Sequence, residues 1–281
     1  MTIKELQEYG IKRLKESNIE DTILKIKLVL TSILNRPKEH LLIHADENVE
    51  EEKVKEFFQA VEKLENKIPL EYITKKREFM KLNFYVDENV LIPRPDTEIL
   101  TEEVIKKCKK GKILDLCTGS GAIAVSLAKY IPESKVTATD ISKNALKIAK
   151  KNAIENKVEV TFIESDLFDN IQEREWDAIV SNPPYIETDI INTLQPEVQK
   201  EPVIALDGGS DGLDFYRKII LNAQNYLKKD GLLALEIGYN QAKDVTQLLR
   251  GQKKYSEIEV IKDLGQNDRV VLARCKNVVF K

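Results

Sequence analysis

The sequence predicts an α/β protein in which a doubly wound, mainly parallel sheet follows a small N-terminal helical domain. From Lys112 onward, segments with a strand pattern alternate with segments of helical pattern, as in consecutive β–α–β units. Residues 1–75 instead carry apolar residues at helical spacing. The last two strand segments are joined by "DLGQND", which is too short for a helical crossover, so they are expected to form an antiparallel pair.

The composition is that of a folded protein with no strong excess of either charge. The chain has 281 residues, 42% of them hydrophobic and 32% charged, and its formal net charge is −3. This balance predicts a buried core and shows no nucleic-acid surface, so we expect no stable nucleic-acid binding. Three cysteines are too few for a disulfide scaffold. Because no run of about 18 apolar residues and no apolar signal core occur, we expect a cytoplasmic protein without membrane association.

Residues 1–75 are predicted to form a separate helical domain. Thr2 and Glu5 have the spacing of a capping box, which predicts a helix that begins at this point. His40 and His44 are four residues apart and lie on one face if their segment is helical. No third ligand of suitable spacing accompanies them, so no metal site is expected.

Residues 76–93 are predicted to form a hairpin linker, and the sheet domain then occupies residues 94–281. Apolar and polar residues alternate in "FMKLNFYVDENVLI", as in short strands. Pro93 and Pro95 end this segment, and Asp96 or Thr97 is expected to cap the helix that continues through "ILTEEVIKKC".

Seven strands are predicted in the sheet domain, and helical patterns fall between most of them. They comprise residues 112–117, 135–140, 158–164, 176–182, 231–238, 256–262 and 269–275. The stretch from Ile186 to about Asp211 has no regular pattern. A loop of that length in a compact domain predicts a lid or a binding loop.

A glycine turn follows the first predicted strand in "ILDLCTGSGAIA". Gly119 and Gly121 allow a sharp turn and a close approach to a ligand, and Asp140 at the end of the second strand suits the two hydroxyls of a ribose. A purely structural turn, a nicotinamide dinucleotide and S-adenosylmethionine all fit this pattern. Asp115 before the turn suits an ammonium group better than a phosphate, which favours S-adenosylmethionine. Asp166, after the third strand, fits either an adenine amino group or a helix cap.

The sequence "SNPPYI" ends the fourth predicted strand. Ligands of open α/β sheets bind at such strand ends. The prolines fix the backbone and push Asn182 toward an extended conformation. The Asn182 side-chain oxygen and the Pro183 carbonyl are therefore two rigid acceptors for one –NH₂ group, and Tyr185 adds a flat wall. Holding both hydrogens orients a weakly nucleophilic nitrogen without a strong base. The motif alone fits a glutamine or an adenine amino group, and a proline-rich strand end is its structural alternative.

Together these motifs carry a resemblance to a known family. "NPPY" with "DLCTGSGAIA" resembles the Rossmann-like class I S-adenosylmethionine-dependent methyltransferases that modify planar amino groups. The segments "LIPRPDTE", "EPVIALDGGSDGLDFYR", "LEIGYNQ" and "KDLGQNDRVVLAR" are similar to the protein-(glutamine-N5) methyltransferases that act on peptide chain release factors. The resemblance implies methylation of the glutamine in the Gly-Gly-Gln tip of class 1 release factors, which modulates translation termination. Because residues 1–75 form a separate helical region without catalytic-looking residues, we hypothesise that they dock the substrate.

The resemblance also implies which residues form the site. The catalytic residues would be Asn182, Pro183 and Tyr185, and the substrate glutamine would be held by Asn182, Pro183, Pro184 and Tyr185. The cofactor would be bound by Asp115, Cys117, Thr118, Gly119, Ser120, Gly121, Asp140, Asp166, Leu167 and Asn182.

Two positions depart from the family pattern, and two other functions stay open. Cys117 stands where the family usually has glycine, and Leu167 stands where some members carry an aromatic residue. A nucleic-acid amino-methyltransferase acting on adenine N6 or guanine N2 would need a basic face or a target-recognition domain, and residues 1–75 show neither. A non-catalytic module that binds the cofactor and docks a partner would not need an intact Asn182–Tyr185 motif.

Overall fold

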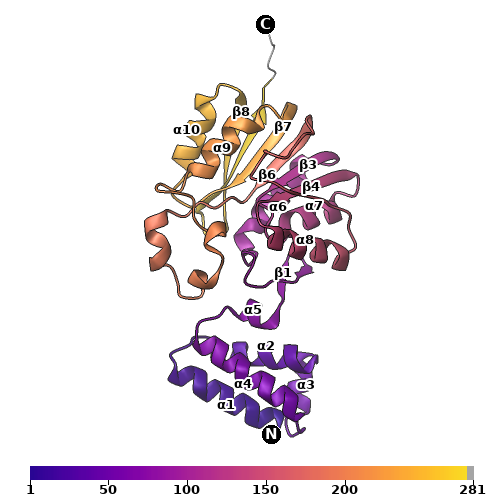
Figure 1. Cartoon of the computed structure of the whole chain (residues 1–281), viewed down its shortest axis with the longest axis vertical. Helices are drawn as coiled ribbons and strands as arrows, with labels where there is room; N and C mark the ends of the chain where they lie inside the picture. Colours follow the sequence, from indigo (N-terminus) through magenta and orange to yellow (C-terminus); the bar gives the residue numbers. More distant parts are fainter. Residues whose placement is uncertain (277–281) are drawn as a thin grey trace. The chain divides into compact units, whose positions relative to one another are not determined.

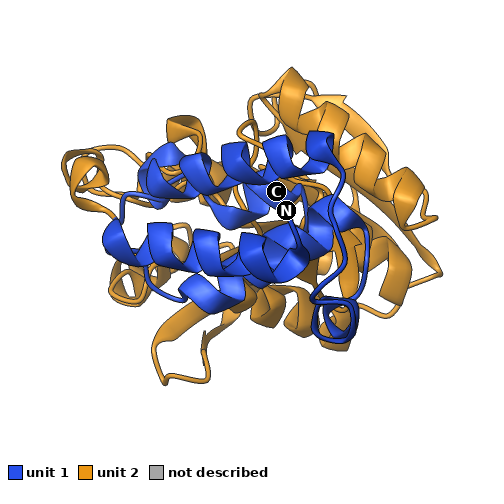
Figure 2. Cartoon of the chain, turned by 90° about the horizontal axis from the view of Figure 1, so that it is seen from below, with its two compact units in different colours: residues 1–76, 195–200 blue, residues 77–194, 201–281 orange. Residues whose placement is uncertain are grey.

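The computed structural model describes residues 1–276, which fall into two compact units. Unit 1 comprises residues 1–76 together with residues 195–200, and unit 2 comprises residues 77–194 and the chain from Glu201 onward (Figures 1 and 2). Unit 1 thus contains the residues of the predicted 1–75 domain together with Lys76 and residues 195–200, and residues 77–93 of the predicted hairpin linker lie in unit 2. None of the helices in the described part of the chain is long and apolar enough to cross a membrane.

Unit 1 is a small helical bundle. Its helices are α1 (Ile3–Glu16), α2 (Thr22–Leu34), α3 (Lys38–Ile43), α4 (Glu51–Glu65) and α5 (Leu70–Thr74). The predicted capping box at α1 is confirmed: the Glu5 backbone N–H donates to Thr2 Oγ1 at 3.2 Å, and the Thr2 backbone N–H donates to the Glu5 carboxylate at 2.9 Å. The apolar faces of these helices meet in a core of their own, which includes Leu6, Ile26 and Phe57.

Unit 2 contains a seven-stranded sheet whose strand order is β5-β4-β3-β6-β7-β9-β8. The strands are β3 (Gly111–Leu116), β4 (Ser134–Asp140), β5 (Thr161–Glu164), β6 (Trp176–Ser181), β7 (Leu227–Glu236), β8 (Tyr255–Lys262) and β9 (Asp268–Cys275). The first five in spatial order are parallel, while β9 runs antiparallel to both β7 and β8, so the predicted antiparallel C-terminal pair is confirmed. β5 begins later and β7 earlier than the sequence pattern predicts.

Helices cover both faces of the sheet (Figure 1). One face packs on α6 (Pro95–Lys107) and α7 (Ala122–Tyr130), with α8 (Lys143–Glu155) beside α7, and the other packs on α9 (Asp214–Ala223) and α10 (Ala242–Gly251). Successive residues of a strand point to opposite faces, so Ile113 lies in the first core and Leu114 in the second. Both faces are therefore buried, as the continuous apolar strands predict.

A short antiparallel hairpin precedes α6. Its strands are β1 (Arg77–Phe79) and β2 (Leu82–Phe84), within the segment where the sequence predicts a hairpin linker. Phe79 and Phe84 are buried against α7 and α8, so the hairpin is a packed part of unit 2.

The predicted cap of α6 is wrong. The helix starts at Pro95 with Arg94 as its N-cap, which places Asp96 and Thr97 inside its first turn. Proline at the first helical position has a suitable φ and lacks an N–H that would go unpaired there, so this helix needs no side-chain cap. The Thr97 side chain is thereby left for another role.

The irregular segment after β6 contains three short 3₁₀ helices. They are η1 (Thr188–Thr193), η2 (Val198–Lys200) and η3 (Val203–Ala205). An isolated parallel bridge between Ile186 and Asp207 closes the base of the segment. The long predicted loop is therefore an ordered excursion with both ends held together.

We predict that Gly121→Ala destabilises unit 2. Gly121 has φ +81°, and an added Cβ would lie 3.0 Å from the Ala149 Cβ and 3.1 Å from its Cα. Backbone strain of this kind costs about 1–3 kcal/mol, and the free energy of unfolding in urea should fall by that order. The matched control is Gly251→Ala at the end of α10, where φ is not positive and no atom lies within 4 Å of an added Cβ. An equal loss in both variants would contradict the expected contact with α8.

Candidate active site

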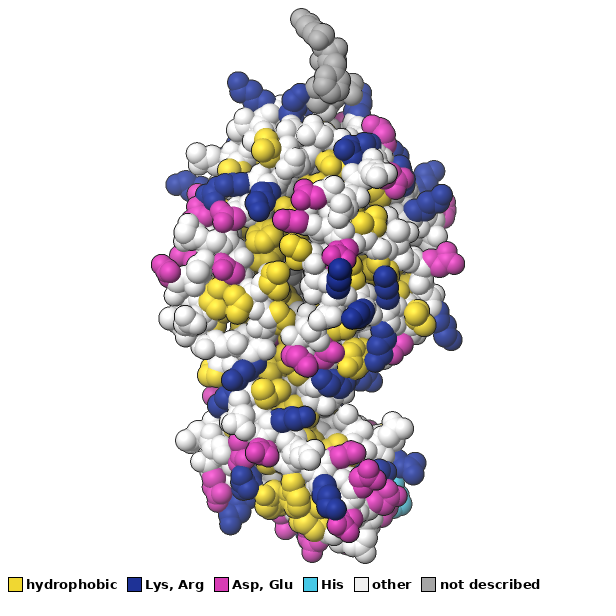
Figure 3. Space-filling view, in the orientation of Figure 1, with side chains coloured by type: hydrophobic (Ala, Val, Ile, Leu, Met, Phe, Trp, Pro, Cys, Tyr) yellow, Lys and Arg dark blue, Asp and Glu magenta, His cyan; other side chains and the backbone are white. Residues whose placement is uncertain are grey.

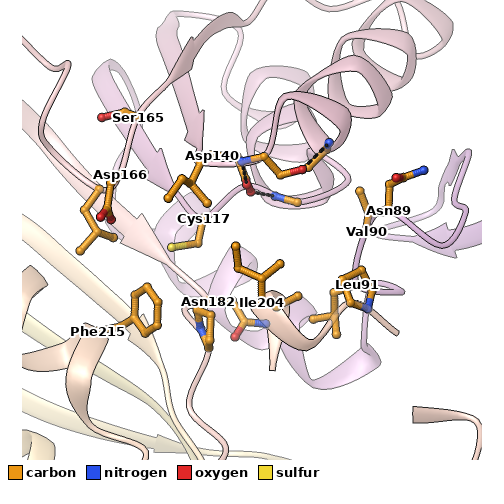
Figure 4. A pocket seen from close by; sticks show the side chains of 18 residues that line it. Asn89, Val90, Leu91, Cys117, Asp140, Ser165, Asp166, Asn182, Ile204 and Phe215 are labelled. Atoms are coloured by element: carbon orange, nitrogen blue, oxygen red, sulfur yellow. Dashed lines mark hydrogen bonds between the residues drawn. The ribbon is translucent and has the colours of Figure 1, made fainter. Parts of the chain in front are cut away.

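A pocket opens at the carboxyl ends of the central strands (Figure 4). β3 pairs with β4 on one side and with β6 on the other. The chain therefore adds β4 and β5 on one side of β3 and then adds β6 and β7 on the opposite side. Such a switch point creates a crevice outside the strand ends. The residues that line it are Asn89, Val90, Leu91, Cys117, Gly119, Asp140, Ile141, Ser142, Ala145, Ser165, Asp166, Leu167, Asn182, Pro184, Pro202, Ile204, Ala205 and Phe215.

Asp140 is fixed at the pocket wall by the turns on either side of it. Its Oδ2 accepts the backbone N–H of Gly119 at 2.8 Å, and its Oδ1 accepts that of Ser142 at 2.8 Å (Figure 4). Burial raises the pKa of the Asp140 carboxyl, and these backbone N–H groups oppose the rise. Each oxygen keeps a further lone pair, so the carboxylate can still accept hydroxyl groups from a ligand in the pocket.

The turn after β3 uses backbone conformations that favour glycine. Gly119 has φ +54°, and no atom lies within 4 Å of a Cβ built on it, so its α-carbon borders open space. Cys117 also lies in the left-handed region, at φ +58°. This explains why glycine is usual at that position in the family that the sequence resembles. The Cys117 side chain reaches the pocket (Figure 4).

Asp115 lies beneath the turn and is completely buried. Its Oδ2 accepts the Thr118 hydroxyl at 2.6 Å, whereas its Oδ1 has no hydrogen-bond partner among the described residues. Burial raises the pKa of this carboxyl to about 7, and the hydrogen bond from Thr118 opposes the rise. A buried carboxylate oxygen without a donor is costly, and Asp115 is not among the residues that line the pocket.

Asn182 and Pro183 follow β6 and present acceptors that nothing in the described chain uses. The Asn182 side-chain –NH₂ donates to Thr97 Oγ1 at 3.1 Å, and this hydrogen bond orients the amide. Its oxygen and the Pro183 carbonyl accept no hydrogen bond from any described residue. Asn182 lines the pocket, whereas the buried Pro183 does not. The grip on an –NH₂ group therefore stays a prediction.

Tyr185 turns away from the pocket toward the interior. Its hydroxyl donates to Glu236 Oε1 at 3.3 Å, and burial raises the pKa of its phenol. Its backbone carbonyl accepts the Gln241 side-chain amide at 3.0 Å. A Cβ on Gly212 would lie 2.4 Å from that same carbonyl, so the glycines after the irregular segment permit this packing. Tyr185 thus anchors the motif rather than lining the cavity.

The predicted site residues divide into two groups. Those that line the pocket are Cys117, Gly119, Asp140, Asp166, Leu167, Asn182 and Pro184. Those that lie behind its wall are Asp115, Thr118, Ser120, Gly121, Pro183 and Tyr185. Gly121 in particular packs against α8, as its short contacts to Ala149 show.

Several pocket residues were missed by sequence reasoning. They come from the segment before α6 (residues 89–91), the turn after β4 (Ile141, Ser142), the irregular segment (Pro202, Ile204, Ala205) and α9 (Phe215). The irregular segment was predicted as a lid or binding loop, and Ile204 does line the pocket although 55% of its surface is exposed. Two proline-containing motifs could have indicated some of these residues. "LIPRPDTE" contains Leu91, and "EPVIA" contains Pro202, Ile204 and Ala205.

An ion pair joins these two motifs. The Arg94 guanidinium contacts Glu201 Oε1, and the Ile92 backbone N–H donates to Glu201 Oε2 at 3.0 Å. Glu201 is buried, so the pair holds Pro202 against the segment before α6.

Hydrophobic side chains gather through the middle of the face of unit 2 that Figure 3 shows, between charged side chains on both sides.

Comparisons with known proteins indicate the class of protein to which the chain belongs. Residues 95–198 match the methyltransferase small domain family, and residues 5–74 match the PrmC N-terminal domain family. A methyltransferase structure from Pyrococcus furiosus superimposes with a TM-score of 0.55 at 20% identity, covering 78% of this chain and 99% of the other. Sheet order, pocket and domain match thus define a methyltransferase of the Rossmann-like class.

The curated relatives narrow this class. The release factor glutamine methyltransferase of Clostridium acetobutylicum is 40% identical over 283 residues, which covers 97% of this chain and 98% of the relative. That of Thermodesulfovibrio yellowstonii is 45% identical over 219 residues, covering 75% and 78%. The chain belongs to the release factor glutamine methyltransferase family.

We predict that the ligand-free protein becomes less stable as pH rises from about 4 to 7. The folded-state pKa of Asp115 is about 7, above the unfolded value near 4, so the folded state binds the extra proton in this window. One such group contributes a slope of about −1.4 kcal/mol per pH unit, and Glu236, whose pKa burial also raises to about 7, acts in the same direction.

Urea unfolding across this pH range measures the effect. The Asp115→Asn variant should show a shallower slope, whereas the exposed Asp169→Asn control should follow the unmodified protein. Identical slopes for Asp115→Asn and the unmodified protein would show that Asp115 does not titrate near pH 7.

Proposed function

We propose that this protein transfers a methyl group from S-adenosylmethionine to the side-chain amide nitrogen of the glutamine in the Gly-Gly-Gln motif of class 1 release factors. The observation that carries the proposal is the pair of free acceptors, Asn182 Oδ1 and the Pro183 carbonyl, held on rigid backbone beside the pocket. The names of the curated relatives support a release factor as the substrate.

The residues present fit S-adenosylmethionine. Asp115 Oδ1 is a buried acceptor without a partner, which suits the ammonium of the methionine end. Asp140 has lone pairs left for the ribose hydroxyls, and Gly119 leaves open space where a side chain would otherwise stand. Asp166 and Leu167 line the pocket beyond Asp140 and would receive the adenine.

The chain's contribution to the reaction is orientation. S-adenosylmethionine supplies a methyl group on a sulfonium, so transfer forms one N–C bond, breaks one S–C bond, and leaves a neutral thioether and a proton released to solvent. Asn182 and Pro183 accept the two amide hydrogens of the substrate glutamine and so direct its nitrogen. As positive charge develops on that nitrogen, the same two oxygens stabilise it through fixed dipoles.

The proposal extends to unit 1 as a docking module for the release factor. Unit 1 has a core of its own, and it contains none of the residues that the sequence indicates for the site. The match of residues 5–74 to the PrmC N-terminal domain family supports a role tied to this family's substrate.

We predict that Asn182→Ala loses methyl transfer and keeps most of its affinity for S-adenosylmethionine. Removal of one positioned dipole typically lowers kcat by about 10²–10³-fold. The measurement uses methyl-labelled S-adenosylmethionine with purified release factor, followed by peptide mass spectrometry to locate the label. Asn222→Ala is the matched control and should turn over normally, because Asn222 is a half-buried residue of α9 whose amide donates only to the Lys218 backbone carbonyl and which does not line the pocket.

Two results would count against the proposal. Unchanged turnover in Asn182→Ala would show that methyl transfer does not require Asn182 to hold the substrate amide. Label outside the Gly-Gly-Gln glutamine, or on nucleic acid in a parallel reaction, would change the substrate to another planar amino group.

We predict that affinity for S-adenosylmethionine falls as pH drops below about 7. The Asp115 pKa is about 7 without ligand, and only the ionised carboxylate pairs with an ammonium group, so binding must remove the proton at lower pH. Calorimetric titration between pH 5.5 and 8.5 measures this dependence, in which Asp140 also takes part because burial raises its pKa too. Asp115→Asn should bind more weakly at pH 8 and depend less on pH. An unchanged pH dependence in this variant would show that Asp115 does not bind the ammonium group of S-adenosylmethionine.

A further inference from the structure

Three sequence motifs contribute polar side chains that lie behind Asn182 and Tyr185. The proposed contact with the substrate amide does not use these side chains. "PRPDTE" supplies Thr97 on α6, "LEIG" supplies Glu236 at the end of β7, and "NDRVV" supplies Arg269 on β9. These elements are distant in sequence, and Thr97 and Glu236 are buried, with 4% and 0% of their surfaces exposed. Polar side chains buried together beside a site are costly unless they hold something in place.

Thr97 is the link to the substrate grip. Its Oγ1 accepts the Asn182 side-chain N–H at 3.1 Å. A hydroxyl that accepts one hydrogen bond still has its own proton to donate. Glu236 Oε2 is buried without a hydrogen-bond partner in the described chain, so it is an unused acceptor for that proton, and Thr97 is among the groups that lower the pKa of Glu236.

Glu236 has one oxygen that receives a donor and one that does not. Its Oε1 accepts the Tyr185 hydroxyl at 3.3 Å, and Oε2 is buried without a partner in the described chain. The charged and titratable groups that face it come from every neighbouring element: Arg269 from β9, Asp96 from α6, Tyr185 after β6 and Tyr216 from α9. Arg269 is itself held by carboxylates, at 3.2 Å from Asp96 and 3.1 Å from Asp263.

The orientation of the Asn182 amide decides whether the site can work. An amide turned by 180° exchanges its oxygen for an –NH₂ group. The turned form would present donors to the donors of the substrate amide, and the grip on the nitrogen would be lost. An acceptor placed behind the Asn182 nitrogen therefore selects the productive orientation.

We propose that Thr97 and Glu236 are positioning residues, which fix the side-chain amide of Asn182 with its oxygen toward the substrate. Thr97 accepts from Asn182, and the hydroxyl proton that it retains has an unused buried acceptor in Glu236 Oε2. Glu236 Oε1 receives the Tyr185 hydroxyl, so in this proposal one carboxyl serves both ends of the Asn182–Tyr185 motif. The inference rests on the proposed function for what Asn182 grips, but the orientation of the amide is a property of this chain alone.

The test compares four variants with the unmodified protein. Thr97→Val removes the hydroxyl and keeps the shape, Thr97→Ser restores the hydroxyl, and Glu236→Gln removes the charge. Thr101→Val is the matched control, because Thr101 is a buried threonine one turn further along α6 whose hydroxyl donates to the backbone carbonyl of Thr97 and not to its side chain. For each protein we would measure kcat and KM with release factor, the Kd for S-adenosylmethionine, and unfolding in urea.

Thr97→Val should lower kcat by about 10-fold or more while the Kd for S-adenosylmethionine changes less than 3-fold, on the order of the loss of one positioned dipole or less. Thr97→Ser should recover most of kcat, and Thr101→Val should retain it. The kcat of the unmodified protein should rise with pH through about 7, as burial raises the pKa of Glu236 to about 7 and the ionised carboxylate is the better acceptor. Glu236→Gln should flatten this rise.

A second measurement needs no substrate. The side-chain amide protons of Asn182, assigned by their absence in Asn182→Ala, should exchange with solvent faster in Thr97→Val than in Thr101→Val. If the unmodified protein does not methylate release factor, the proposed function fails while this exchange still tests the inference. Unchanged exchange together with unchanged kcat in Thr97→Val, or equal losses in both valine variants, would overturn the positioning role.

Discussion

The orientation of one side-chain amide is the constraint on which this site depends. In the proposed function, Asn182 offers its oxygen to the substrate because its –NH₂ group donates to Thr97. Thr97 in turn owes its position to a helix that begins at Pro95 and needs no side-chain cap. The prolines after Asn182 fix the backbone, and the hydrogen bonds behind it fix the amide. The two together make an acceptor whose direction does not have to be found during the reaction.

The site carries several buried polar groups that do not favour folding. Asp115 and Glu236 are completely buried carboxyls, each with an oxygen that lacks a hydrogen-bond partner among the described residues. Burial therefore raises the pKa of each to about 7. Local costs of this kind gather where a protein must bind or position something. In the functions proposed here, Asp115 would receive a ligand cation, and Glu236 would receive hydroxyl donors of the chain itself.

Much of the fold was predictable because it follows from local patterns. Alternating strand and helix segments predicted the sheet, and the short connection before β9 predicted its antiparallel pairing. The positions of Asp140 and Asn182 at one pocket were predictable, since strand ends converge at one edge of a parallel sheet. The roles of Thr97 and Tyr185 were not. Thr97 has the local signature of a helix cap, and Tyr185 that of a wall residue, and only long-range contacts decide otherwise.

The sequence by itself determined the class of fold, the strand-end residues and, through its motifs, the family. These depend on hydrophobic periodicity and on the conformations that glycine and proline allow, both of which act over a few residues. Only the tertiary structure decided which side chains of the other motifs lie close together. Thr97, Glu236 and Arg269 lie on three elements that the sheet order brings together behind the Asn182–Tyr185 motif. No local pattern records that convergence, because hydrogen bonds between distant elements leave no periodic trace in a sequence.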